Sequence, residues 1–161
     1  MTDGPTRSLT MIQPLLVVRD AQAAMVFYAR VFGATEQWRL MHYHRVGHAI
    51  LRLGQSEFVV LDEFPEAGIV GPSGQEPTTG PRLMVQVDDV DGVLARAVEA
   101  GATLLRAPDN QWWGVRSGAF VDPFNHRWSV HTIVEPISIE EMQRRSDALD
   151  LYPPPRGTPI E

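Results

Sequence analysis

The sequence contains no cysteine, no long hydrophobic run and no excess of positive charge. Without cysteine it forms no disulfide bond, thiol nucleophile or thiolate metal site, which is compatible with a reducing compartment. Its hydrophobic stretches stay below the ~18 residues of a membrane-spanning helix. The formal net charge of -6 disfavours nucleic acid and anionic membranes as partners. Because the N-terminus also lacks the basic and apolar pattern of a secretion signal, we expect a cytoplasmic protein with no nucleic-acid or membrane partner.

Motifs for several common kinds of catalysis are missing as well. The sequence has no GxGxxG dinucleotide loop, no P-loop, no GxSxG nucleophile elbow and no HExxH zinc motif. What it has is an ordinary soluble composition, with 161 residues of which 43% are hydrophobic and 21% are charged. This is enough for one domain with a packed core.

An internal repeat is the most informative pattern that is present. Asp20 opens a helical pattern that ends at Gly33, and Asp89 opens a second one that ends at Gly101, about 68 residues later. Asp is a favoured N-cap residue, and Gly supplies the left-handed conformation at a helix end. Each helical pattern follows one strand pattern and precedes three more, so the sequence predicts two βαβββ modules. Two such half-sheets form a cupped surface that can hold a small molecule.

The repeat sets the predicted domain organisation. Module one covers 10–63, a linker rich in Pro and Gly covers 64–81, and module two covers 82–136. Together they form one α+β domain of cupped mixed sheets over 10–136. Residues 1–9 are expected to be a flexible N-terminus, and 137–161 hold a short helix and a Pro-rich tail.

The elements follow from periodicity and turn residues. Ser138 and Glu141 belong to a capping box that opens the C-terminal helix. Gly47 and Gly54 are predicted to mark the turns between the later strands of module one. We predict strands at 11–18, 35–44, 47–53, 56–62, 82–87, 103–107, 115–121 and 126–134, and helices at 21–32, 90–100 and 138–149.

The two modules, their Asp-capped helices and the DPFNH motif at 122–126 resemble the vicinal oxygen chelate superfamily, which includes glyoxalases, bleomycin-resistance proteins and extradiol dioxygenases. A WGxR stretch at 113–116, a DPFxHRW stretch at 122–128 and a short helix near 137–145 together look like its PhnB-like branch. The resemblance covers about residues 11–146. It implies eight strands in two half-barrels, often assembled as a homodimer, and is less specific for function because the fold hosts many chemistries.

The resemblance also implies where a metal would bind, since metal-dependent members use one side chain from each of four strands. These positions fall on Gln13, Val60, Arg82 and Ser129. Gln13 is an acceptable ligand, Val60 cannot coordinate, Arg82 is a permanent cation and Ser129 is a poor neutral ligand. An open catalytic metal site needs about three protein ligands. We therefore expect no metal at the usual positions and no other cofactor.

A divalent metal in a new position is the alternative. His42, His44 and His48 lie close together in the sequence, and His42 and His44 are predicted to share one strand face. The competing interpretation takes all three as turn and surface histidines.

Strand alternation assigns the residues that line the predicted cup. Arginines in a concave wall suit a carboxylate or phosphate, because a guanidinium binds such groups bidentately. The alternative is that each Arg is paired with an acidic residue at a sheet edge. The predicted ligand-binding residues are Gln13, His48, Arg52, Arg82, Gln86, Arg127 and Ser129, with His131 on the same face.

Aromatic and acidic side chains complete the list of candidates. Trp113 follows Trp112 in a predicted loop and serves either as a stacking surface for a planar ligand or as a core residue. Glu57, Asp62 and Glu63 are the carboxylates expected nearest the cup, and besides histidine they are the candidates for a general base.

Three functions stay open at this point. The leading hypothesis is a small-molecule-binding protein of the glyoxalase/bleomycin-resistance type, with a metal-free cup that binds an anionic or aromatic ligand. The alternative is a glyoxalase-like lyase, isomerase or dioxygenase that uses a relocated divalent metal or His/Glu acid–base chemistry. A third is an interaction protein whose cup is filled by side chains. A small molecule and a second copy of the chain are the expected partners.

Overall fold

The computed structural model describes residues 11–74 and 81–149 of the chain. They form two compact units, the first made of 11–74 with Pro123–His126 and the second made of 81–122 with 127–149. The predicted flexible residues 1–9, the Pro-rich tail beyond 149 and part of the predicted linker lie outside the described residues. Within the described part, no helix is long and apolar enough to cross a membrane.

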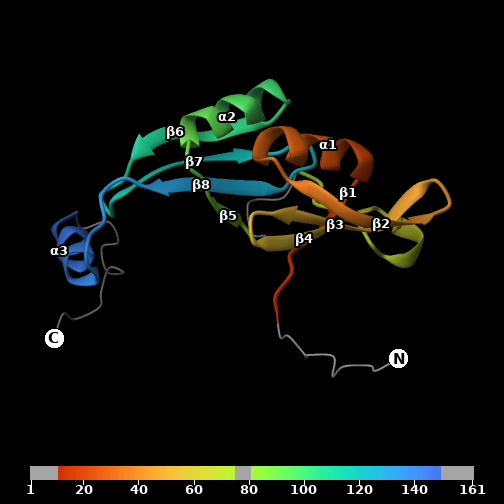
Figure 1. Cartoon of the computed structure of the whole chain (residues 1–161), viewed down its shortest axis with the longest axis horizontal. Coiled ribbons are helices and arrows are strands. Elements are labelled where there is room, and N and C mark those ends of the chain that lie inside the picture. Colours follow the sequence, from red (N-terminus) through yellow and green to blue (C-terminus); the bar gives the residue numbers. More distant parts are fainter. Residues whose placement is uncertain (1–10, 75–80, 150–161) are drawn as a thin grey trace, which may run out of the picture. The chain divides into compact units, whose positions relative to one another are not determined.

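The first unit is a four-stranded mixed sheet with a helix on one face (Figure 1). The strand order is β1-β4-β3-β2, with β1 parallel to β4 and the other neighbours antiparallel. Its elements are β1 (Leu15–Val18), α1 (Ala21–Phe32), β2 (Thr35–His42), β3 (Arg45–Leu53) and β4 (Ser56–Asp62), followed by a short 3-10 helix (Pro65–Ala67).

Helix α1 begins and ends where the sequence predicts. The Asp20 carboxylate accepts a hydrogen bond from the Ala23 N–H at 2.9 Å, which caps the first turn. Gly33 ends the helix with φ 73°, a left-handed conformation that glycine adopts without strain. The apolar stripe of α1, which includes Tyr28 and Val31, is fully buried and forms the core of this unit with the sheet.

The second unit repeats this architecture in the order β5-β8-β7-β6, with β5 parallel to β8. The Asp89 carboxylate caps α2 by accepting a hydrogen bond from the Gly92 N–H at 2.9 Å. The predicted α+β fold of two βαβββ modules with a C-terminal helix is therefore confirmed. The elements are β5 (Leu83–Gln86), α2 (Val90–Glu99), β6 (Thr103–Asn110), β7 (Val115–Val121), β8 (Arg127–Ile133) and α3 (Ile139–Leu149).

One turn differs from the prediction. Strand β2 ends at His42, and Tyr43 and His44 form the turn to β3, with Tyr43 at φ 53°. Gly47 is not a turn residue, because it lies inside β3 where the register against β2 shifts between Leu40 and Met41. Glycine favours turns and β-bulges alike, so its presence alone did not distinguish the two.

The DPFNH motif contributes to the first unit although it follows β7 in the sequence. The Phe124 ring lies edge-on to Phe27 of α1 at 6.3 Å between centroids. The Asn125 side chain donates a hydrogen bond to the Pro72 carbonyl at 2.9 Å, and Nε2 of His126 lies 2.9 Å from the Val17 carbonyl oxygen. Strand β8 consequently begins at Arg127, one residue later than predicted.

Candidate functional site

Each sheet has one face toward its helix and one face turned away from it, which we call the open face. In the first unit, Phe58 packs edge-on against Tyr28 of α1 at 5.5 Å between ring centroids. Alternation along β4 therefore places Glu57, Val59 and Leu61 on the open face. The strand registers add Leu15 and Val17 of β1, Trp38 and Leu40 of β2, and His48, Ile50 and Arg52 of β3, with Gln13 just before β1.

The centre of the first open face is apolar. Ile50, Val59 and Leu61 form a buried cluster, and Val17 and Phe64 pack against it. Trp38 remains 52% exposed and stacks on the His48 ring with 5.2 Å between centroids and 13° between planes. This pair presents a flat aromatic surface beside aliphatic side chains, which is a suitable environment for a planar ligand.

The predicted arginine of this face is paired with an acid. Arg52 forms a salt bridge with Glu57 at 2.7 Å between its Nη2 and Oε1. The Gln13 side-chain amide donates to the second oxygen of Glu57 at 3.4 Å. Arg52 thus follows the alternative interpretation, in which an acidic partner across the sheet offsets its charge.

The three histidines proposed as relocated metal ligands lie in different settings. His42 ends β2 and contacts the rings of Tyr43 and Phe64, whereas His44 lies in the turn, so the prediction that His42 and His44 share a strand face is wrong. His48 stacks on Trp38. No group of three or more His, Cys, Asp or Glu side chains arranged to hold a metal ion occurs within 11–74 and 81–149.

Asp62 is a structural residue rather than a candidate base. One of its carboxylate oxygens accepts the Ala21 N–H at 2.7 Å and the other accepts the Val46 N–H at 2.6 Å. Asp62 therefore joins the start of α1 to β3 and β4 on the helix side of the sheet. Glu63 likewise accepts a backbone hydrogen bond, from the Gly71 N–H at 2.9 Å.

The second open face has a different chemistry. A Cβ at Gly118 would meet Leu94 of α2 at 2.3 Å, which identifies the helix side of β7. The buried side chains of Trp128 and Val130 share that side. By alternation and register, the open face carries Arg82, Met84 and Gln86 along β5, Ser117, Ala119 and Val121 on β7, and Arg127, Ser129 and His131 on β8.

No acidic residue lies in β5, β7 or β8, and the acidic residue of the edge strand β6 on this face is Asp109, opposite Ser117. Arg82 and Gln86 are exposed, and Arg127 and Ser129 are half-buried. Among the described residues, neither the Arg82 nor the Arg127 side chain has a hydrogen-bond or ion-pair partner. Arg116, on the helix side of β7, is by contrast paired with Asp91 at 2.6 Å, and this pairing lowers the pKa of Asp91 through a side-chain hydrogen bond.

A buried polar group lies in the same face. His131 pairs with Gln86 on β5 and with Ser117 on β7 in the strand registers. Ser117 is only 4% exposed and accepts a hydrogen bond from Arg106 at 3.1 Å. Within the described residues, Nδ1 of His131 is the buried side-chain nitrogen or oxygen that lacks a hydrogen-bond partner. Sequence reasoning missed Ser117 and Arg106, for which the available signal was a small polar residue at an open-face position of β7.

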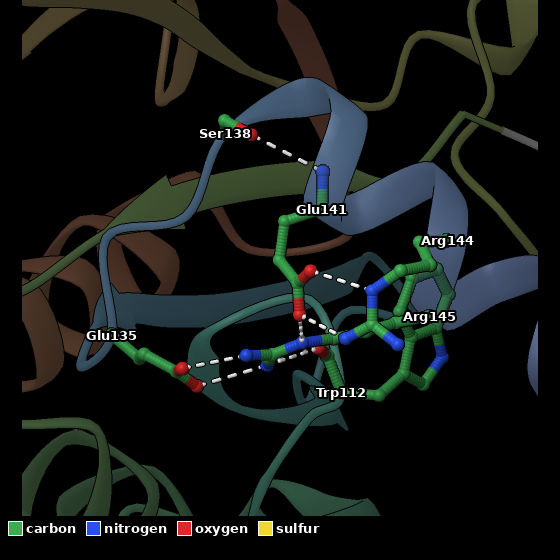
Figure 2. A network of polar contacts seen from close by, with 6 residues as sticks. All are labelled: Trp112, Glu135, Ser138, Glu141, Arg144 and Arg145. Atoms are coloured by element: carbon green, nitrogen blue, oxygen red, sulfur yellow. Dashed lines mark hydrogen bonds and ion pairs between the residues drawn. The ribbon is translucent and has the colours of Figure 1, made fainter.

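Trp112, the first residue of the tryptophan pair, lies next to α3 (Figure 2). The Trp112 and Trp113 rings are half-buried and meet edge-on at 5.1 Å in the loop before β7. Gly114 closes this loop at φ 82°, where a Cβ would come within 2.1 Å of the Glu135 carbonyl oxygen. The role of Trp113 in ligand binding stays a prediction.

Arg145 attaches α3 to this loop. Its guanidinium donates to the Trp112 carbonyl at 3.0 Å and pairs with Glu135 at 2.6 Å, and its Nε donates to Glu141 at 2.7 Å (Figure 2). Hydrogen bonds from Arg144 and Arg145 lower the pKa of Glu141 to about 2. Ser138 accepts the Glu141 N–H at 3.1 Å, which confirms the capping contact at the start of α3.

The positions that a metal would occupy by family resemblance do not fit one. Val60 is fully buried on the helix side of β4 and has no donor atom. Gln13 is hydrogen-bonded to Glu57, Arg82 is a cation, and Ser129 offers a neutral hydroxyl. This set contains one ordinary ligand type where about three are needed.

Comparison with known proteins assigns the family. Residues 10–130 match the model of the Glyoxalase/Bleomycin resistance protein/Dioxygenase superfamily, and the chain belongs to this superfamily. An uncharacterized protein of Mycobacterium bovis is 35% identical over 137 residues, which are 82% of this chain and 89% of that protein.

Solved structures show the same fold. A glyoxalase/bleomycin resistance protein/dioxygenase family enzyme from Burkholderia phytofirmans is 25% identical, with a TM-score of 0.56, over 74% of this chain and 94% of the other. The fosfomycin resistance protein FosX from Mesorhizobium loti is 19% identical, with a TM-score of 0.57, over 89% of this chain and 99% of the other. The second likeness concerns the fold alone.

Proposed function

We propose that this protein binds small anionic or aromatic molecules on the open faces of its sheets, without a catalytic metal. The observation that carries the proposal is the second open face, where Arg82 and Arg127 have no acidic partner among the described residues. Gln86 and Ser129 add neutral donors beside them. Asp109 of β6 lies opposite Ser117, two rows or more from the pair of arginines. Cations and neutral donors whose own row holds no carboxylate favour a carboxylate or phosphate ligand.

The first open face supports the aromatic part of the proposal. Trp38 is half-exposed and its ring is fixed by the stack on His48. An aromatic surface that is already ordered loses little conformational entropy when a planar molecule stacks on it. We therefore assign aromatic recognition to this face and anion recognition to the second.

An enzyme of the lyase, isomerase or dioxygenase kind is the second candidate, and the imidazole of His131 among these donors favours it. A histidine that acts as a base or metal ligand usually has its other ring nitrogen fixed by a hydrogen-bond partner. Nδ1 of His131 has no such partner among the described residues. Because this partner is missing, we favour a binding protein over an enzyme.

We also propose a homodimer. The edge strand β6 leaves Leu104 and Leu105 exposed, and Ile139 of α3 is largely exposed as well. Edge strands and apolar side chains of this kind need cover. Light scattering after size-exclusion chromatography should give twice the chain mass of 18.0 kDa, and a single-chain mass would contradict the dimer.

Titration calorimetry with benzoate and inorganic phosphate tests the anion site. Replacing Arg127 with Gln should weaken both by about tenfold or more, because a hydrogen bond to a charged group contributes about 1.5–3 kcal/mol. Arg116→Gln is the matched control, since it removes the same charge from the other side of the same sheet. Equal affinities in wild type and Arg127→Gln would contradict the proposal.

Elemental mass spectrometry on untagged protein, incubated with zinc, nickel, manganese and iron, tests the metal-free state. We expect no metal above background. One equivalent of tightly held metal would contradict this part of the proposal and favour the enzyme.

A further inference from the structure

The position of the His131 ring indicates a second contact with the ligand, in addition to the contacts made by the arginines. Its Nδ1 atom is buried and unpaired, whereas the residue as a whole is half-buried. Nε2 of the same ring is not a buried unpaired atom, and within the described residues no group hydrogen-bonds to it, so it lies at the accessible edge of the ring. The neighbours of His131 in the sheet are Gln86 and Ser117, and no hydrogen bond joins either of them to the imidazole.

The buried nitrogen selects between the two neutral tautomers of the ring. A neutral imidazole carries a proton on one nitrogen and a lone pair on the other. Buried N–H donors without a partner are rarer in folded proteins than buried acceptors without one. The tautomer with the lone pair at the buried Nδ1 and the proton at Nε2 is therefore the favoured one.

We infer that His131 is held as the Nε2–H tautomer and donates a hydrogen bond to a second acceptor oxygen of the anionic ligand. This inference rests on the proposed anion site and narrows its ligand class. The ligand is a small acid whose carboxylate binds Arg82 and Arg127 and which carries a further carbonyl or carboxylate oxygen toward His131.

The strand geometry orders these contacts. Arg127, Ser129 and His131 alternate along one face of β8, so neighbouring members are separated by ~7 Å. Ser129 lies between the arginine and the imidazole, and its hydroxyl serves either group of the ligand. The ligand is therefore expected to bind in one direction along β8, with its carboxylate at Arg127 and its second acceptor oxygen at His131.

The tautomer can be measured directly on the full chain. Long-range proton–nitrogen NMR correlations distinguish a protonated ring nitrogen from a bare one. We expect the protonated signal at Nε2 of His131 and the bare signal at Nδ1. The reverse assignment would overturn the inference whether or not any ligand binds.

The ligand class is tested with two acids of equal charge, pentanoate and 4-oxopentanoate. The second should bind about fivefold more tightly, as expected for one added hydrogen bond. In His131→Gln the amide nitrogen reaches the place of Nε2, so the preference should persist. In His131→Asn the amide reaches only the place of Nδ1, and the two acids should then bind equally.

The outcomes separate this inference from the proposed function. If wild type binds both acids with equal affinity, anion binding stands and the role of His131 is overturned. If neither acid binds wild type, the anion site itself is contradicted and the ligand class with it. A preference that persists in His131→Asn also overturns the assignment, provided that denaturation curves show both variants folded.

Discussion

The two open faces are built on the same scaffold and differ in chemistry at matching places. Leu61 pairs with Val17 in the first sheet, and His131 pairs with Gln86 at the corresponding place in the second. The first face is aliphatic and aromatic at its centre. The second has polar side chains, Gln86, Ser129 and His131, at the matching positions of β5 and β8.

The two faces also differ in whether their arginines have an acidic partner. Arg52 is paired across the sheet with Glu57, whereas Arg127 lies between Val121 of β7 and Arg82 just before β5, with no acidic residue beside it on either strand. A shared backbone thus fixes where side chains project, and the residues at a few register positions decide which ligand chemistry each face accepts. A repeat identified in the sequence predicts common architecture without predicting common function.

Leu61 of the first face and His131 of the second occupy matching positions. Placing the residue of one face at the matching position of the other should change stability most at Leu61. Leu61→His places an imidazole in the buried cluster and should lower the free energy of unfolding by about 3 kcal/mol, because apolar burial is lost and a polar group is buried. Leu40→His, at a position that is 64% exposed on the same face, should cost less than about 0.5 kcal/mol. Chemical denaturation measures both, and equal losses would contradict the division into a buried centre and an exposed margin.

A second substitution should give Arg127 of the second face an acidic partner like the one that Arg52 has on the first face. Val121→Glu places a carboxylate opposite Arg127, as Glu57 lies opposite Arg52. The new ion pair should compete with the ligand and reduce affinity for inorganic phosphate by about tenfold, or about 1.4 kcal/mol. Val121→Gln supplies the same shape without charge and should retain most of the affinity. If both variants bind phosphate like wild type, Arg127 is not the anion contact.

The aromatic surface should give a smaller effect. Trp38→Ala should weaken a neutral planar probe such as indole by about fivefold, about 1 kcal/mol, because the stacking surface is lost. Phosphate affinity should not change, since Trp38 belongs to the other face. Isothermal titration calorimetry measures the affinity for both ligands. If Trp38→Ala lost phosphate binding and kept indole binding, the assignment of ligand types to the two faces would be contradicted.

The smallest expected effect concerns α3, which only the second unit has within the described residues. The pKa of Glu141 is lowered to about 2 from its usual 4.5 by hydrogen bonds from Arg144 and Arg145. The ionised form therefore stabilises the attachment of α3 above pH 4.5, and this contribution is lost as the pH falls from about 4.5 to about 2. Carbon NMR of the Glu141 carboxyl follows the titration, and a midpoint near 4.5 would contradict the network of Figure 2.

Local signals in the sequence predicted much of the fold. Asp20 and Gly33 bound α1 at the predicted residues because capping is decided within a few positions of the chain. Strand alternation correctly separated the helix side from the open face in both units, since the period of two needs no long-range information. Gly47 was misread because the bulge it occupies depends on pairing with another strand.

The pairing of the candidate site residues could not be predicted in the same way. Arg52 has Glu57 as its partner through the β3–β4 register, and Gln13 reaches Glu57 from just before β1, 44 positions away in the sequence. The unpaired nitrogen of His131 depends on the residues that the two neighbouring strands, β5 and β7, place around it. The composition of the sequence and the spacing of its residues do not predict such long-range contacts. The same holds for the three histidines, whose separation only became clear with the turn at Tyr43.

A phosphate titration followed by proton–nitrogen NMR on the whole chain shows which open face binds the anion. We expect the backbone amide signals of 82–86 and 127–131 to shift with a common affinity, while those of 13–17 and 48–52 do not shift. Shifts that cluster around Arg52 and Glu57 and spare Arg127 would contradict this expectation, because the paired arginine would then be the anion site.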